Sequence, residues 1–179
     1  QISMMISNGL NNNRNIPPPL TVSLRRGSNI ESVHKVHSAI CDSKGRLLMC
    51  AGNASRHTFI RSALKPFQAL PFISSGTAEK IKCGEKSIAI SCGSHSGSQD
   101  HARESFKILW KSNIEVDNLQ CPIPKNHKSR LEHNCSGKHA AFLATCKKMG
   151  WPLNNYLDGN HPLQKEIFRR VAGLIGIPA

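Results

Sequence analysis

The spacing of apolar residues changes near residue 56, and this change constrains the fold more than any other feature of the sequence. Before it, apolar residues occur in short segments, and the turn-forming run of residues 42–45 separates the last of them from the rest. These apolar residues are Val22, Leu24, Val33, Val36, Ala39, Ile40, Leu47, Leu48 and Met49. Short apolar segments divided by Gly-containing turns predict β-strands joined as hairpins.

Beyond Arg56 the apolar residues recur every three or four positions, which indicates helices. The first candidate covers residues 62–74, although Pro66 and Pro71 interrupt it, and a proline is tolerated only near a helix start. The remaining candidates cover residues 99–111, 137–149 and 161–176. The sequence therefore predicts a mixed α and β fold of the α+β class, with an antiparallel sheet early and packed helices later.

The amino-terminal residues differ in composition from the rest. Residues 8–19 form a polar run that ends in three prolines, so we expect residues 1–19 to be a flexible leader and residues 20–179 to be the folded domain. Apolar residues make up 39% of the chain, and no apolar run approaches the roughly 18 residues of a membrane span. We expect a soluble globular protein without a membrane segment.

Charge and cysteine content narrow the class of protein further. The chain carries 24 Lys and Arg against 11 Asp and Glu, a formal charge of +13, which suggests an acidic partner such as nucleic acid. The basic residues are scattered and not interleaved with aromatic residues, so nucleic-acid binding is the alternative and not the expectation. The seven cysteines are odd in number and form no compact disulfide framework, which favours a reducing, cytoplasmic location.

The first group that could perform chemistry is the pair Ser62 and Lys65, three residues apart. If a helix begins near Ser62, one turn brings the hydroxyl and the amine to one face, where a deprotonated amine could activate the serine as a nucleophile. The spacing alone is weak evidence, because Ser32 and Lys35 repeat it in a segment predicted to be a strand. The alternative is a surface lysine beside a helix-capping serine.

Two further segments concentrate reactive side chains. Residues 91–98 are rich in Ser and Gly, so they form either a turn or a loop whose N–H groups approach a ligand, with His95 as a base or merely a solvated ring. Residues 133–139 contain two histidines, Cys135 and Lys138. Zinc ligation, a Cys-His nucleophile and anion binding at a helix start remain open there, as does a buried Cys135 between exposed histidines.

Three segments in this order resemble the signature of the L-asparaginase II family, the kind typified by the inducible rhizobial enzyme. They are residues 61–71 (RSALKPFQALP), residues 92–97 (CGSHSG) and residues 133–140 (HNCSGKHA), and the resemblance extends from about Leu20 to Ala179. It implies a fold like that of serine β-lactamases and glutaminases, a homodimer, and conversion of L-asparagine to aspartate and ammonia through an acyl-enzyme.

The resemblance also implies roles for individual residues. Ser62 matches the expected nucleophile, with Lys65 beside it as the base, and Ser94 matches a second catalytic serine. Cys135 and Lys138 match residues that line the substrate site and contribute to a zinc site, where the metal assists substrate binding. Arg61 and His95, which lie within the matching motifs, are expected to contact the substrate, whereas His139 adjoins them without an assigned role.

The chain departs from the family in two respects. Family members are longer, and after the position of Ala179 they carry an Asp-Gly-Cys segment that completes the metal site and a second catalytic lysine. We therefore expect this chain to be an amino-terminal portion, inactive alone. Ser98 also stands where an acidic residue is common.

Two rival functions are considered. One is a penicillin-recognising serine hydrolase, which is disfavoured because neither Ser-Asp-Asn nor Lys-Thr-Gly occurs in the chain. The other is an inactive remnant or a basic binding module, suggested by the net charge.

Overall fold

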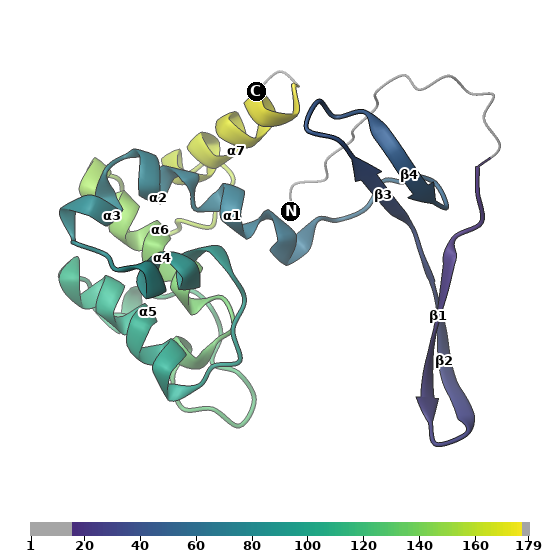
Figure 1. Cartoon of the computed structure of the whole chain (residues 1–179). Helices are drawn as coiled ribbons and strands as arrows, with labels where there is room; N and C mark the ends of the chain where they lie inside the picture. Colours follow the sequence, from purple (N-terminus) through teal and green to yellow (C-terminus); the bar gives the residue numbers. More distant parts are fainter. Residues whose placement is uncertain (1–15, 177–179) are drawn as a thin grey trace. The chain divides into compact units, whose positions relative to one another are not determined.

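The computed structural model describes residues 16–176, which fall into two compact units divided between Phe59 and Ile60. Residues 1–15 of the predicted leader lie outside the described residues. Strands fill the first unit and helices the second, so the predicted α+β class is confirmed (Figure 1). The division lies three residues after the change in apolar spacing near residue 56, although that change was interpreted as a boundary between strands and helices and not between two units. The predicted extent of one domain over residues 20–179 stays a prediction, because two compact units can belong to one domain.

The first unit contains two antiparallel hairpins. Strand β1 (Leu20–Arg26) pairs with β2 (Asn29–Val36), with Leu20 opposite Val36 and a register shift between Leu24 and Arg25. Strand β3 (Ser38–Cys41) pairs with β4 (Leu47–Ala51). The predicted turn between β3 and β4 is confirmed, because Asp42 accepts hydrogen bonds from the N–H groups of Lys44 and Arg46 through its side chain.

The second unit begins with short helical segments. They are the 3₁₀ turn η1 (Arg61–Leu64) and helices α1 (Lys65–Gln68), α2 (Leu70–Ser74) and α3 (Thr77–Lys80). We expected one helix over residues 62–74, and the structure divides it. Pro66 and Pro71 lie in the first turns of α1 and α2, where the missing N–H leaves no hydrogen bond unmade, so each proline starts a new helix instead of continuing one.

Longer helices follow and form the body of this unit. They are α4 (Glu85–Cys92), α5 (Gln99–Lys111), α6 (Ser136–Met149) and α7 (Pro162–Ile175), with the short 3₁₀ turns η2 (Val116–Asn118) and η3 (Arg130–Glu132) between α5 and α6. The predictions for α5, α6 and α7 are confirmed to within one residue at each end. Helices α3 and α4 were not predicted.

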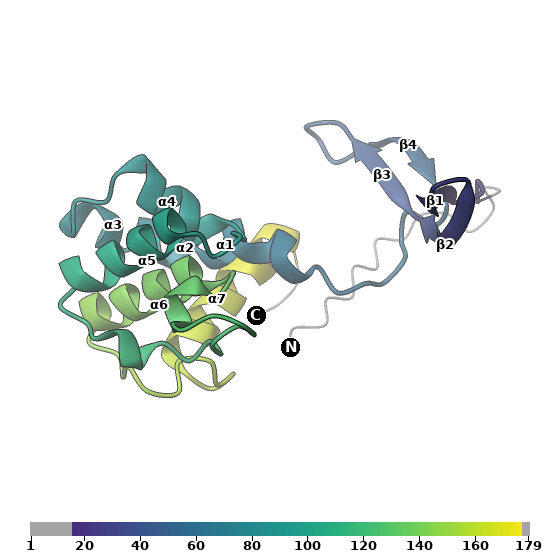
Figure 2. The same ribbon diagram turned by 90° about the horizontal axis from the view of Figure 1, so that it is seen from below.

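Helix α6 is the centre of the helical unit. Ten of its 14 residues are buried, including Ala140, Leu143 and Cys146. It packs against α4, α5 and α7, and Figures 1 and 2 show α6 flanked by α5 and α7. The loops that precede α6 and follow α4 are held at one end of this packed core, which fixes their backbones relative to α1.

Candidate active site

The amine of Lys65 is the point at which the three predicted motifs meet. Lys65 lies at the start of α1, its residue is 1% exposed, and its Nζ donates to three oxygens from two other segments. These are Ser94 Oγ at 2.6 Å, Gly93 O at 3.1 Å and Asn134 O at 3.3 Å. The alternative of a surface lysine is therefore wrong, because this amine is enclosed by the loop after α4 and the loop before α6.

Ser62 lies near a helix start, one turn before Lys65, as its motif suggested. It is exposed in η1, and its carbonyl accepts the backbone N–H of Lys65. Among residues 16–176, the Lys65 amine donates hydrogen bonds to Gly93 O, Ser94 Oγ and Asn134 O. It forms none with the Ser62 hydroxyl. The alternative of a helix-capping serine is also wrong, since Ile60 occupies the N-cap of η1.

Arg61, directly before Ser62, has an unusual backbone. Its φ is +54°, in the left-handed region that a side chain with a Cβ rarely adopts. Such strain costs about 1–3 kcal/mol and persists only where the surrounding structure holds it. The Arg61 side chain is exposed, and its predicted contact with substrate stays a prediction.

A buried polar network holds the loop that carries Ser94. The N–H of Gly97 donates to His95 Nδ1 at 3.1 Å, so the ring proton of the neutral imidazole lies on Nε2, 3.0 Å from Ser136 Oγ. Ser136 Oγ donates to Leu131 O at 2.7 Å and lies 2.8 Å from Ser105 Oγ. One hydroxyl thus donates once and accepts twice, which satisfies all its hydrogen-bonding capacity.

This arrangement indicates that His95 is a structural ring and not a general base. Burial, followed by the charges of His101 and Lys65, lowers the pKa of His95 to about 4, so the ring is neutral at physiological pH. Its Nδ1 already accepts the Gly97 N–H, which leaves no free lone pair to take a substrate proton. The predicted contact of His95 with substrate stays a prediction.

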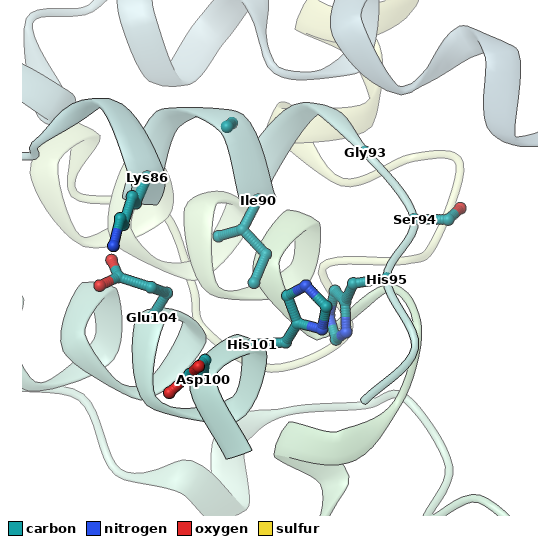
Figure 3. A pocket seen from close by; sticks show the side chains of 9 residues that line it. Lys86, Ile90, Gly93, Ser94, His95, Asp100, His101 and Glu104 are labelled. Carbon is teal, nitrogen blue, oxygen red and sulfur yellow. The ribbon is translucent and has the colours of Figure 1, made fainter. Parts of the chain in front are cut away.

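The opposite side of this loop borders a separate pocket. It has a volume of about 380 Å³, and its walls include Lys86, Ile90, His101 and Glu104. The His95 and His101 rings are tilted against each other, with their centroids 4.9 Å apart. Figure 3 shows that the Ser94 side chain points away from both rings. The Ser94 hydroxyl therefore faces Lys65 and not the interior of this pocket.

The third motif forms the other wall of the site. Cys135 is half-buried at the N-cap of α6, with its Sγ 3.2 Å from Asn134 Oδ1. The Lys138 amine lies 3.5 Å from Gln68 Oε1 and 5.4 Å from the centre of the Phe142 ring, a cation–π distance. Burial lowers the pKa of Lys138, and the nearby charge of Lys65 adds to that effect.

His133 and His139 are both fixed by hydrogen bonds. His133 Nδ1 accepts the N–H of Cys135 at 3.1 Å. His139 is 7% exposed, and its Nδ1 lies 2.7 Å from the hydroxyl of Tyr156, which itself accepts the N–H of Gln120. The alternative of a buried Cys135 between exposed histidines is therefore wrong, because His139 is the buried residue.

The electrostatic character of this end of the helical unit follows from these contacts. Burial lowers the pKa of His133, and burial together with the charge of Lys138 lowers the pKa of His139 to about 3. Both rings are therefore neutral at physiological pH, and Lys138 is the basic side chain beside them. A site of this kind favours a ligand that carries a carboxylate.

The residues present supply only part of a zinc site. Zinc normally takes four ligands, and Cys135 and Lys138 provide at most one thiolate and one amine. Within residues 16–176, no three His, Cys, Asp or Glu side chains gather as a metal cluster. The described side chains do not by themselves fit the ion, so we derive no step through zinc, and its presence stays a prediction.

The buried Lys65 amine is bonded to the hydroxyl of Ser94, and Ser62 lies three residues before Lys65 in η1. An amine placed in this way is able to exchange a proton with a serine hydroxyl. The family model for L-asparaginase II matches residues 22–179, which is most of the chain. The chain therefore belongs to the L-asparaginase II family. No curated protein matched the sequence.

The structure also bears on the expectation about membrane segments. Within residues 16–176, no helix is long and apolar enough to cross a bilayer.

Proposed function

We propose that this chain carries the serine-lysine centre of an enzyme that hydrolyses the side-chain amide of L-asparagine to L-aspartate and ammonia. Membership of the L-asparaginase II family supports an amidohydrolase. The observation that carries the proposal for the centre itself is the 2.6 Å hydrogen bond between Lys65 Nζ and Ser94 Oγ. It joins two motifs 29 residues apart at an amine that is almost completely enclosed.

The roles follow from how the Lys65 amine is bonded. A charged amine uses all three of its protons on Ser94, Gly93 O and Asn134 O. A neutral amine keeps two donors for the carbonyls and turns its lone pair to the Ser94 hydroxyl. The two carbonyls thus orient the lone pair, and Ser94 is the group that can pass a proton to Lys65.

Ser62 is assigned as the nucleophile and Ser94 as the proton relay. The Ser62 hydroxyl proton passes to Ser94 Oγ as the Ser94 proton passes to Lys65, and Ser62 Oγ attacks the amide carbon of asparagine. Collapse of the tetrahedral intermediate breaks the C–N bond, and the leaving nitrogen takes the proton from Lys65 to depart as ammonia. Water then attacks the ester, releases aspartate and restores the Ser62 hydroxyl.

The positive end of the site is assigned to substrate recognition. Lys138 lies beside the neutral rings of His133 and His139, so a substrate carboxylate meets positive charge there while Lys65 acts as the base. An oxyanion hole needs backbone N–H groups that are not already engaged. The N–H groups of His95 and Gly97 donate to Asn134 O and His95 Nδ1, so neither of these two serves.

The test is ammonia release by the 179-residue chain from L-asparagine and L-glutamine, with and without zinc. The variants are Ser62→Ala, Ser94→Ala and Lys65→Met, and Ser74→Ala is a matched control, since Ser74 is exposed on α2 and bonds only Leu70 O. Lys65→Met and Ser94→Ala should each lower kcat by roughly 10²- to 10⁴-fold, the usual contribution of proton transfer. Ser62→Ala should abolish turnover, and Ser74→Ala should leave it unchanged.

Activity retained by Ser62→Ala but lost in Ser94→Ala would count against this assignment and transfer the nucleophile to Ser94. No ammonia release by the unaltered chain, with circular dichroism showing that it is folded, would agree with the expectation that an amino-terminal portion is inactive alone.

A further inference from the structure

Several side chains with hydrogen-bond donors line a pocket within the hairpin unit. It has a volume of about 440 Å³, within the roughly 300–1,000 Å³ range of ligand pockets. It lies where β2 ends and where the chain continues after β4. Its polar walls come from Lys35, His37, Asn53, Arg56 and Thr58.

The orientation of the His37 ring is fixed by the backbone after β4. Gly52 has φ +67°, and a Cβ there would collide with the ring, so the backbone passes directly against the imidazole. The N–H of Asn53 donates to His37 Nδ1 at 2.8 Å. A backbone N–H in this position cannot rotate away, so Nδ1 carries a lone pair and Nε2 carries the ring proton.

Arg56 brings a second donor to the same ring. Its Nη1 lies 2.9 Å from His37 Nε2. A neutral imidazole accepts at only one nitrogen, and Nδ1 already accepts from Asn53. A guanidinium has no acceptor at all. The N–H groups of His37 Nε2 and Arg56 Nη1 therefore point at each other, with their nitrogens 2.9 Å apart. This arrangement becomes favourable when a bound acceptor receives both hydrogen bonds.

The charges around the pocket also favour an anion. No carboxylate lines it. Residues 1–59 contain only two acidic residues, and each pairs elsewhere at 2.6 Å, Glu31 with Arg26 and Asp42 with Arg46. The Lys35 amine, 2.7 Å from Thr21 Oγ1, adds a further positive charge beside the pocket.

We propose that this pocket binds a small oxyanion, a carboxylate or phosphate group, held by the Nε2–H of His37 and the guanidinium of Arg56. Two oxygens on one atom are spaced to receive two neighbouring N–H donors, which is the geometry of bidentate recognition. A chloride ion offers no such pair. No residue of this pocket takes part in the centre proposed at Lys65, and the inference does not depend on the proposed hydrolysis.

The experiment uses the full 179-residue chain labelled with ¹⁵N. Two-dimensional NMR of the histidine side chains reports which His37 nitrogen carries the proton, with His37→Gln identifying its signals. Sodium phosphate and sodium succinate are then titrated separately at constant ionic strength, with sodium chloride as the reference. Arg56→Gln removes the charge and the paired guanidinium donors, Arg56→Lys keeps the charge, and Arg26→Gln is the control, since Arg26 pairs with Glu31 outside the pocket.

The expected result is a proton on Nε2 and a saturable shift of the His37 signals. A shift with phosphate but not with succinate would identify a phosphate group as the ligand. A shift with succinate but not with phosphate would identify a carboxylate. Arg56→Gln should weaken binding at least tenfold, Arg56→Lys less, and Arg26→Gln should leave it unchanged. A ring proton on Nδ1 would overturn the proposal even if no variant folds, and so would shifts that match those in chloride or equal affinity in Arg56→Gln.

Discussion

The hairpin unit and the helical unit differ in how much of their apolar surface they bury. Every buried apolar residue of the described chain lies in the helical unit, from Ala69 to Ala172. In the hairpin unit the strands expose large apolar side chains on both hairpins. These are Leu20, Val22, Leu24, Ile30, Val33, Val36, Ile40, Leu47, Leu48 and Met49, each at least 37% exposed.

This difference shows that the formation of secondary structure and the stability of a unit have different causes. Strand-forming sequences and a well-formed turn are sufficient for the backbone pairing of β1 with β2 and of β3 with β4. A two-stranded hairpin with no buried face is at best marginally stable in water. The helical unit, by contrast, surrounds α6 with packed helices, so it can hold the Lys65 amine in one position.

The sharpest test of this difference is to separate the units. A chain of residues 60–179 should unfold in a single cooperative transition, because its core is internal to it. A chain of residues 16–59 should show no cooperative transition, since its apolar side chains gain little burial. Thermal unfolding followed by circular dichroism measures both. A cooperative transition in residues 16–59, or none in residues 60–179, would contradict the proposed difference in stability between the two units.

Matched substitutions sharpen the comparison within the full chain. Leu143 on α6 is 0% exposed, and Leu48 on β4 is 61% exposed. Leu143→Ala should lower the free energy of unfolding by about 2–5 kcal/mol, because a cavity forms in a packed core. Leu48→Ala should change it by no more than about 0.5 kcal/mol. Urea denaturation measures the two values, and similar losses would show that β4 is covered in solution.

The same contrast explains how much of the fold the sequence predicted. Both ends of α5 were predicted correctly, because Ser98 caps its start and its apolar residues follow helical spacing. Helix α4 was missed because its core, Ser87 to Ser91, is a short apolar run bordered by serines and has almost no amphipathic pattern. Burial in the hairpin unit was not predictable either, since spacing specifies which residues share a face but not what covers that face.

The candidate site was likewise predictable from the sequence only in part. The motifs indicated that Lys65, Ser94 and Cys135 belong to one region, and the structure brings their segments together. The partner of the Lys65 amine was not predictable, because the bond to Ser94 depends on the packing of α1 against α4 and not on spacing. The link from His95 through Ser136 to Ser105 was also missed, since no local pattern connects serines 31 residues apart.

Two glycines with positive φ provide a smaller test of the comparison. Gly27 (φ +61°) lies in the open turn between β1 and β2, where an added Cβ would meet no other atom within 4 Å, whereas a Cβ at Gly97 (φ +77°) would collide with Glu132 O. Both Ala variants should cost about 1–2 kcal/mol for the backbone conformation. Gly97→Ala should cost roughly 1–3 kcal/mol more, because the Ser94 loop must shift. Denaturant midpoints measure this, and equal costs would mean that the loop is not pressed against η3.

A further expected effect is a pH dependence between about pH 6.5 and 4 that histidines of the helical unit should cause. The pKa of His95 falls from 6.5 to about 4 on folding, mainly through burial, so between these values the unfolded chain binds a proton that the folded chain does not. Stability from this residue is complete above pH 6.5 and is lost as the pH falls towards 4.

His95→Gln should flatten the fall in melting temperature between about pH 6.5 and 4.5. It should not abolish that fall, since the pKa of His139 is lowered in the same direction. His34→Gln, on the exposed face of β2, is the control and should leave the slope unchanged. A slope that His95→Gln leaves intact would mean that the His95 ring is hydrated in solution, and the polar network behind Ser94 would then not hold the loop.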